Sequence, residues 1–181
     1  MPDGLRATTA TVWVRVAATV AAYVVAGVVA GVVWEQWWSA PVGLTYGGEW
    51  FLEPAGPDFS FQGAALYVLI ALPLGVVLAV LSSIRPGHEV ATVITVLVAA
   101  AIGGAVMYAV GHAIGPPDPQ ALAAARPDFT PLPGDLVLGG STPGERPFAS
   151  TALIAMPAGA MAGLVGVYLL GRKRIGEPSH G

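Results

Sequence analysis

The stretch VAATVAAYVVAGVVAGVVW (residues 16–34) decides the fold of this chain, because it contains no Asp, Glu, Lys or Arg. Crossing the hydrocarbon core of a bilayer takes about 20 apolar residues in a helix. Lipid gives the backbone no hydrogen-bond partner, so such a segment must be helical in spite of its many valines. The following Ser39-Ala40-Pro41 is a poor signal-peptidase site. We therefore expect a retained transmembrane helix.

Three more stretches further along the chain have the same character. They run from about 63 to 84, from about 90 to 114 and from about 150 to 170. Each is long enough to span the bilayer. The predicted fold is therefore an all-α membrane protein, a four-transmembrane-helix bundle in one membrane domain over residues 1–181. Two long loops, 35–62 and 115–149, remain outside the bilayer.

The composition agrees with this fold class and excludes several others. Only 10% of the 181 residues are charged and 55% are hydrophobic, whereas soluble domains carry about 25% charged residues. The net charge of −3 argues against a nucleic-acid partner, which requires a clustered basic face. The chain has no cysteine, which excludes disulfides, redox CxxC motifs and thiolate metal sites.

The distribution of Lys and Arg predicts the orientation. Six of these residues lie before the first span, between the second and third spans, or after the fourth, and these are Arg6, Arg15, Arg85, Arg172, Lys173 and Arg174. Only Arg126 and Arg146 lie in the two long loops. Basic residues gather on the cytoplasmic side of membrane proteins. We therefore expect a multi-pass plasma-membrane protein with both termini in the cytoplasm.

The two long loops contain signals for local structure. In the first, Gly47-Gly48 between apolar residues predicts a hairpin over Val42–Leu52. In the second, Asp118-Pro119 is typical of a helix start leading into Gln120–Ala125. Residues 131–134 then predict a turn and 135–138 a strand, ended by two glycines. We expect these pieces to pair into a small extracytoplasmic cap.

Small residues recur at helical spacing within the spans and predict close helix packing. The candidates for helix packing are Gly27, Gly31, Gly104, Gly159 and Gly163. Glycine lets two helix backbones approach closely, which matters because lipid supplies no hydrophobic force between helices. The pattern favours packing within one bundle, with a homo-oligomer face as the alternative.

An internal repeat is a further hypothesis. LIALPLG (residues 69–75) resembles LIAMPAG (residues 153–159) at an offset of 84, which also maps Gly27 onto Gly111. Two-helix halves related in this way would share an orientation in the membrane, as in some transporters. Chance similarity in an Ala- and Leu-rich chain is the alternative. Pro73 and Pro157 should kink their helices, which would suit a hinge for transport.

Groups with catalytic potential are few. Glu35 and His112 stand at the loop ends of the first and third spans and form a candidate polar pair. Such a pair could bind a proton, a metal or a lipid headgroup, although anchoring or a local salt bridge is its ordinary role. No nucleophile, metal-ligand or phosphate-cradling motif occurs. We expect no enzyme activity, no cofactor and no metal site.

The hairpin in the first loop carries the candidate partner-binding residues Tyr46, Trp50 and Phe51. Aromatic side chains dominate binding energy at protein interfaces. The alternative is that Trp50 and Phe51 pack on the second loop or dip into the membrane interface.

The layout resembles a family of uncharacterised four-span membrane proteins of actinobacteria, mycobacteria included. The resemblance rests on Gly27-x-x-x-Gly31-x-x-Trp34 before Ala40-Pro41 and on Gly111-x-x-x-Gly115-Pro116-Pro117. It implies a plasma-membrane location and no transferable activity. The leading hypothesis is a non-enzymatic cell-envelope protein, an accessory or assembly subunit of a larger membrane complex. A small transporter or channel component built from a 2+2 helix repeat is the alternative.

Overall fold

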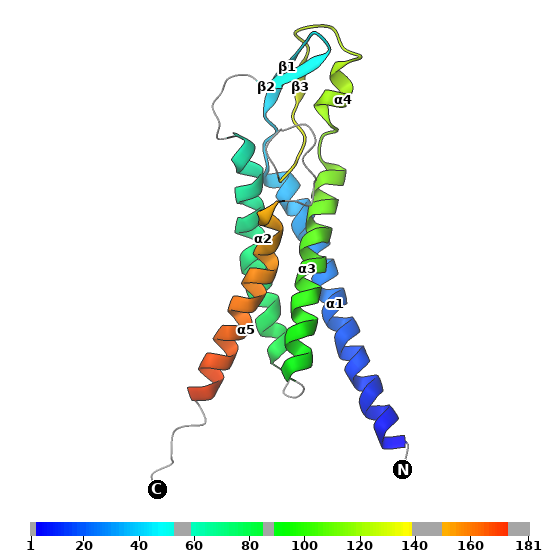
Figure 1. The fold of residues 1–181 in the computed structure, drawn as a ribbon, viewed down its shortest axis with the longest axis vertical. Coiled ribbons are helices and arrows are strands. Elements are labelled where there is room, and N and C mark those ends of the chain that lie inside the picture. The colour runs from blue at the N-terminus through cyan, green and yellow to red at the C-terminus, as the bar shows by residue number, and fades with distance from the viewer. Residues whose placement is uncertain (1–2, 53–58, 85–88, 139–149, 174–181) are drawn as a thin grey trace.

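Four long helices make up most of the molecule (Figure 1). The computed structural model describes residues 3–52, 59–84, 89–138 and 150–173. The long helices are α1 (Asp3–Trp37), α2 (Phe59–Ser83), α3 (Glu89–Ile114) and α5 (Ala155–Lys173). Each contains a stretch long and apolar enough to cross a membrane. The predicted four-helix architecture is confirmed, and the protein is a multi-pass membrane protein.

The helices pack in two parallel pairs rather than as sequential hairpins. α1 packs mainly against α3, and α2 mainly against α5. α1 and α3 both run toward the end of the bundle that carries the sheet, whereas α2 and α5 run away from it (Figure 1). The start of α1 and the end of α5 therefore lie at the opposite end, which we call the terminal end.

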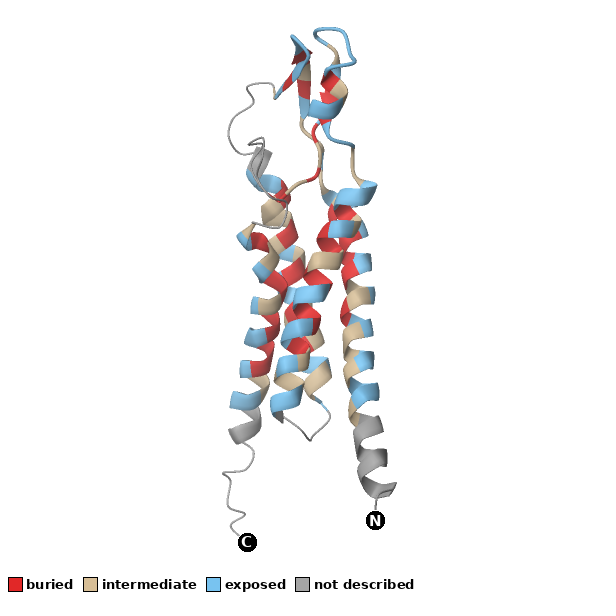
Figure 2. Ribbon diagram, turned by 45° about the vertical axis from the view of Figure 1, so that its right-hand side comes forward, coloured by how far each residue is buried: buried red, intermediate tan, exposed pale blue. Residues whose placement is uncertain are grey.

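Buried residues concentrate in the half of the bundle nearer the sheet (Figure 2). The largest buried side chains there include Tyr23, Trp34, Tyr67, Met107 and Met156. Toward the terminal end α1 and α5 diverge from the other two helices (Figure 1). The bundle is thus closed and aromatic-filled near the sheet and more open at the terminal end.

A small antiparallel sheet and one short helix form the cap. The strands are β1 (Val42–Tyr46), β2 (Glu49–Leu52) and β3 (Pro131–Pro133), in the order β2-β1-β3. The turn between β1 and β2 needs positive φ at both central residues, and Gly47 (φ 60°) and Gly48 (φ 81°) supply it. Strands from both long loops meet in this sheet, so the predicted cap from two loops is confirmed.

The second loop departs from its prediction in one respect. Residues 131–133, expected as a turn, form β3, while residues 135–138, expected as a strand, form no strand. Leu136 and Leu138 are instead buried in the core of the bundle, and this burial explains their apolar character. Gly139 and Gly140 lie outside the described residues. α4 (Pro119–Ala123) begins as predicted, with the Asp118 carboxylate accepting a hydrogen bond from the Gln120 N–H at 2.9 Å.

The two prolines of the spans have different surroundings. Pro73 lies within α2. Pro157 lies in the first turn of α5, directly after a 3-10 turn over Thr151–Ile154. A proline costs little in the first turn of a helix because no helical hydrogen bond is lost there. Pro157 therefore marks the start of α5 and is not a mid-helix kink.

Candidate functional site

The sheet of the cap has two faces of different character. Side chains alternate between the faces of a strand, and directly paired residues share a face. Trp50 pairs with Thr45, and both are buried. Phe51 pairs with Leu44 on the other face, where half of the Phe51 side chain (51%) is exposed. The cap therefore has one face packed on α4 and one face open.

Trp50 belongs to the packed face. It is only 8% exposed and contacts Ala123 and Leu132 in a small core of the cap. Its indole Nε1–H donates to the Leu132 carbonyl at 3.1 Å. An added side chain at Gly43 would collide with the indole ring, so the glycine makes room for it. Trp50 therefore packs inside the cap and is not exposed for binding a partner.

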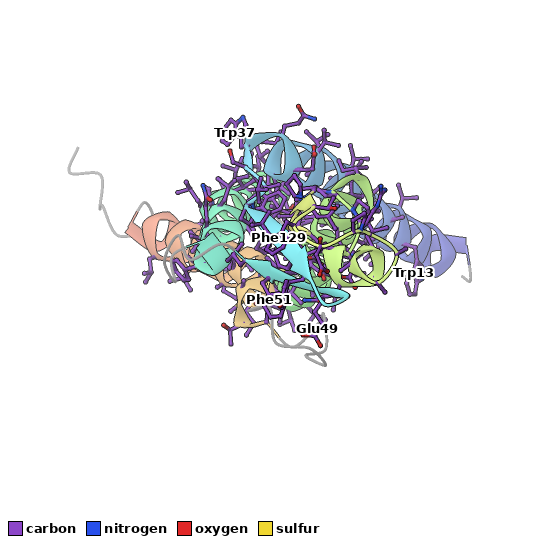
Figure 3. The ribbon with its side chains drawn as sticks, turned by 90° about the horizontal axis from the view of Figure 1, so that it is seen from above. Trp13, Trp37, Glu49, Phe51 and Phe129 are labelled. Atoms are coloured by element: carbon purple, nitrogen blue, oxygen red, sulfur yellow. The ribbon has the colours of Figure 1, made fainter. Side chains whose placement is uncertain are left out.

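The open face carries a cluster of apolar side chains, which we call the outward sheet face. Tyr46 is 59% exposed, and its ring lies against the equally open ring of Phe129, with centroids 5.7 Å apart. In Figure 3 the cap lies over the middle of the bundle, with Phe51 and Phe129 on it, while Trp37 projects at the perimeter. The residues of this face are Val42, Leu44, Tyr46, Phe51, Phe129, Pro131 and Pro133.

Phe129 adopts an unusual backbone conformation. Its φ of 63° lies in the left-handed region, which is a strained conformation for a bulky residue. The Phe129 N–H donates to the Thr45 carbonyl at 2.6 Å. Thr45, fully buried, donates its hydroxyl to the Pro127 carbonyl at 2.6 Å and accepts from the Thr130 N–H at 2.9 Å. This network holds an exposed phenyl ring in place at a cost in backbone strain.

Both edges of the sheet are protected against another strand. At β2, the Gln120 amide donates to the Trp50 carbonyl at 2.9 Å and accepts from the Trp50 N–H at 3.2 Å. This side chain thus occupies the hydrogen-bonding groups that an added strand would need. At β3, Pro131 and Pro133 have no N–H to offer. Contacts to another molecule would therefore use the face of the sheet and not its edges.

An aromatic and polar cluster joins the cap to the bundle. The Trp34 ring meets Tyr67 edge-on at 5.3 Å, and its Nε1–H donates to the Gly63 carbonyl at 2.9 Å. Tyr108 stacks on His112 at 5.7 Å. The His112 Nδ1 lies 2.9 Å from the carbonyl oxygen of Leu136, which belongs to the second loop. This cluster holds the descending end of the second loop against α3.

Among the described residues, no hydrogen bond or ion pair joins Glu35 to His112, the candidate polar pair. Glu35 accepts a hydrogen bond from the neighbouring Gln36 at 3.1 Å. His112 instead bonds to the Leu136 carbonyl and stacks on Tyr108. Sequence reasoning overlooked Asp135, a partly buried carboxylate of the second loop. Burial raises the pKa of the Asp135 carboxyl, a backbone hydrogen bond and His112 oppose the rise, and Asp118 adds to it.

The five candidate packing glycines all lie at close helix contacts. Gly27 lies against the backbone of Gly103, and Gly31 would place an added Cβ 2.6 Å from the Met107 carbonyl oxygen. Gly104 would meet the Tyr67 hydroxyl at 3.1 Å. On α5, Gly159 lies against the backbone of Leu72, and Gly163 would meet the Val76 carbonyl at 2.7 Å. Gly27, Gly31, Gly159 and Gly163 line the two seams α1/α3 and α2/α5, whereas Gly104 of α3 faces Tyr67 of α2.

Among the residues that the structure describes, no three His, Cys, Asp or Glu side chains come close enough to hold a metal ion. No known protein-family model, curated protein or solved structure matches this chain. The class that the fold defines is that of a four-span membrane protein with a small sheet-based cap. Its exposed apolar sheet face is the best-defined candidate site.

Proposed function

We propose that this protein is a non-enzymatic accessory or assembly subunit of a larger membrane complex, and that its outward sheet face binds the extracytoplasmic part of that complex. In this proposal the protein resides in the plasma membrane, in line with the actinobacterial resemblance, and both termini are cytoplasmic. The observation that carries it is the exposed cluster of Tyr46, Phe51 and Phe129 on the sheet of the cap.

Three features support binding through this face. The sheet lies beyond the ends of the four helices (Figure 1), so lipid does not explain its exposed aromatic side chains. Contiguous exposed apolar patches on proteins mark interaction sites. Phe129 has a φ in the left-handed region, and strained residues cluster at functional sites.

The surface suits a protein partner that presents a complementary apolar face. Glu49 shares the outward face, paired with Tyr46, and provides a charged rim beside the aromatic cluster. Aromatic centres with polar rims are the usual anatomy of protein interfaces. The blocked edges direct the partner to the face and protect the cap from joining other sheets.

The experiment is a pull-down from native membranes that compares wild type with the double variant Phe51→Ser and Phe129→Gly. Glycine at 129 relieves the positive φ, so the variant should fold normally. We expect recovery of the partner to fall about tenfold or more, because losing aromatic anchors costs about 2 kcal/mol or more. Glu49→Ala, on the same face, is the matched control and should change recovery little.

Two outcomes decide the proposal. Loss of the partner with normal membrane levels of the double variant supports it. Full recovery of the partner by the double variant overturns it. Trp50→Ala is unsuitable for this test, because removing a buried tryptophan costs about 3–5 kcal/mol and would damage the cap itself.

A transporter component is the second candidate, and one observation favours it. The α2/α5 seam repeats its contacts at the 84-residue offset seen in the sequence: Gly75 lies against Met156, and Gly159 against Leu72. Against this candidate, Tyr23, Trp34 and Tyr67 fill the half of the bundle nearer the cap. A flux assay in vesicles that contain only this purified chain would separate the two functions.

A further inference from the structure

A partly open groove lies at the terminal end of the bundle, between the first half of α1, the end of α2 and the start of α3. Its volume is about 380 Å³. It lies where α1 diverges from its neighbours (Figure 1). The outward sheet face is at the other end of the molecule, so this groove is a separate feature.

The lining of the groove combines a cation, hydroxyl groups and an apolar wall. Arg15 is the charged residue of the lining, and Thr19 lies one helical turn from it on α1. Ser82 of α2 and Thr92 and Thr95 of α3 contribute further hydroxyls. The remaining lining residues are aliphatic or alanine, and the larger of them are Val12, Val16, Leu78, Leu81, Ile84 and Val96.

The polar groups lie at matching depths. α1 and α3 run parallel, and Gly27 lies against Gly103. Because both helices rise equally per residue, Arg15 and Ala91, each twelve residues before this contact, lie at the same level. Thr19 and Thr95, each eight residues before it, also lie at the same level. The apolar stretch of α1 begins at Val12, so Arg15 lies about one turn inside it. This is the depth at which a long basic side chain reaches the headgroups of a bilayer.

We propose that this groove binds a single phospholipid from the leaflet at the terminal end. Its phosphate pairs with the Arg15 guanidinium and accepts hydrogen bonds from the Thr19 and Thr95 hydroxyls, and one acyl chain lies along the aliphatic wall. A guanidinium fits phosphate because its planar set of N–H donors matches two phosphate oxygens at once. The aliphatic wall explains why the phosphate should be that of a lipid and not a free anion.

Native mass spectrometry of the full chain in neutral detergent, titrated with phosphatidylglycerol, tests this site. We expect one lipid to saturate the wild-type protein. Arg15→Gln should weaken that binding about tenfold or more, since it removes the charge-assisted hydrogen bonds from the guanidinium to the phosphate. Arg126→Gln removes an exposed arginine of the cap and should leave the binding unchanged. Binding of Arg15→Gln equal to wild type would overturn the proposal.

Two competing compounds test which part of the phospholipid the groove recognises. Diacylglycerol with the same acyl chains lacks the phosphate, and glycerol 3-phosphate lacks the chains, so neither should displace the lipid. Displacement by diacylglycerol would show a purely apolar groove, and displacement by glycerol 3-phosphate would show a site for a free anion. Either result overturns the proposal. Ala91→Trp, at an exposed lining position, should block binding with Arg15 still present.

A photoreactive amino acid at Ala18, an exposed residue of the lining, tests the groove in native membranes. The expected products are adducts with phospholipid. A protein adduct as the main product would show that a partner helix fills the groove, and would overturn the lipid assignment.

Discussion

Gly75 and Gly159 occupy equivalent positions on the two sides of the α2/α5 contact. Gly75 lies against the Met156 carbonyl, and Gly159 lies against the Leu72 carbonyl. The two glycines are 84 positions apart in the sequence, and so are Leu72 and Met156, the residues whose carbonyls they face. The contact is therefore reciprocal, as in an interface between two identical helices.

The α1/α3 contact does not follow the same offset. Gly27 lies against Gly103, so the 84-residue offset would place Gly111 against Thr19. Gly111 instead lies against the Trp34 ring. The repeat hypothesis thus has structural support at α2/α5 and none at α1/α3.

Alanine scanning of two glycines in α5 tests the seam. A Cβ at Gly159 would overlap the Leu72 carbonyl, whereas a Cβ at Gly166 would meet nothing within 4 Å. We expect Gly159→Ala to lower the free energy of unfolding by about 1–3 kcal/mol, because the helices must separate. Gly166→Ala should be neutral or stabilising by up to about 1 kcal/mol, since alanine favours helix. Equal thermal stability of the two variants in detergent would contradict the close contact of α2 and α5 at Gly159.

Removal of one hydroxyl tests the aromatic cluster below the cap. The Tyr67 hydroxyl donates to the Gly104 carbonyl at 2.8 Å. Tyr67→Phe keeps the edge-on contact with Trp34 and removes this hydrogen bond, which should cost about 1 kcal/mol. Tyr168→Phe, at a partly exposed position of α5, is the control and should cost little. Unfolding in detergent measures both variants.

Asp135 should make the stability of the protein depend on pH. Burial raises the pKa of its carboxyl, so the folded state holds the proton at pH values where the unfolded chain has lost it. Stability should therefore fall as the pH rises from about 4, the ordinary pKa of an aspartate, through the raised value. Asp135→Asn should flatten this part of the profile and raise the unfolding midpoint at neutral pH. Glu49→Gln, at an exposed carboxylate of the cap, should leave the profile unchanged.

Single cysteines test the orientation, because the chain has none of its own. We expect Ala125→Cys, at an exposed cap position, to react with a membrane-impermeant thiol reagent on intact cells. Gly176→Cys, in the C-terminal tail, should react only after the cells are lysed. These results follow from the six-to-two distribution of Lys and Arg, and the reverse pattern would show an inverted topology.

The sequence predicted the spans and the first hairpin because each depends on local chemistry. Lipid requires a long apolar helix, and Gly47-Gly48 suits a turn with two positive φ angles. The alternating direction of side chains along the predicted second strand also bears on the candidate partner-binding residues. Trp50 and Phe51 are neighbours in a strand and so point to opposite faces, which means that both could not be exposed anchors on one face.

The positions of β3 and of the groove depend on contacts between distant segments. The apolar pattern of 135–138 suits a strand or a buried loop equally well, and only the packed bundle shows that Leu136 is core. Arg15 and Thr19 lie at helical spacing that the sequence shows plainly. Which helix faces them depends on the parallel pairing of α1 with α3, which no local signal predicts.

The sheet of the cap joins a hairpin from the first loop to a strand that follows α3. During biosynthesis the hairpin leaves the ribosome before α2, α3 and β3, which all follow it in the chain. Until α2 and α3 have been inserted, one edge of β1 has no neighbour and Trp50 has neither Leu132 nor Ala123 to cover it. Completion of the cap is therefore a late event, because the sheet needs a strand that follows α3. A chain arrested earlier leaves Trp50 uncovered and one edge of β1 unpaired, and an unpaired edge is a template for pairing with another chain.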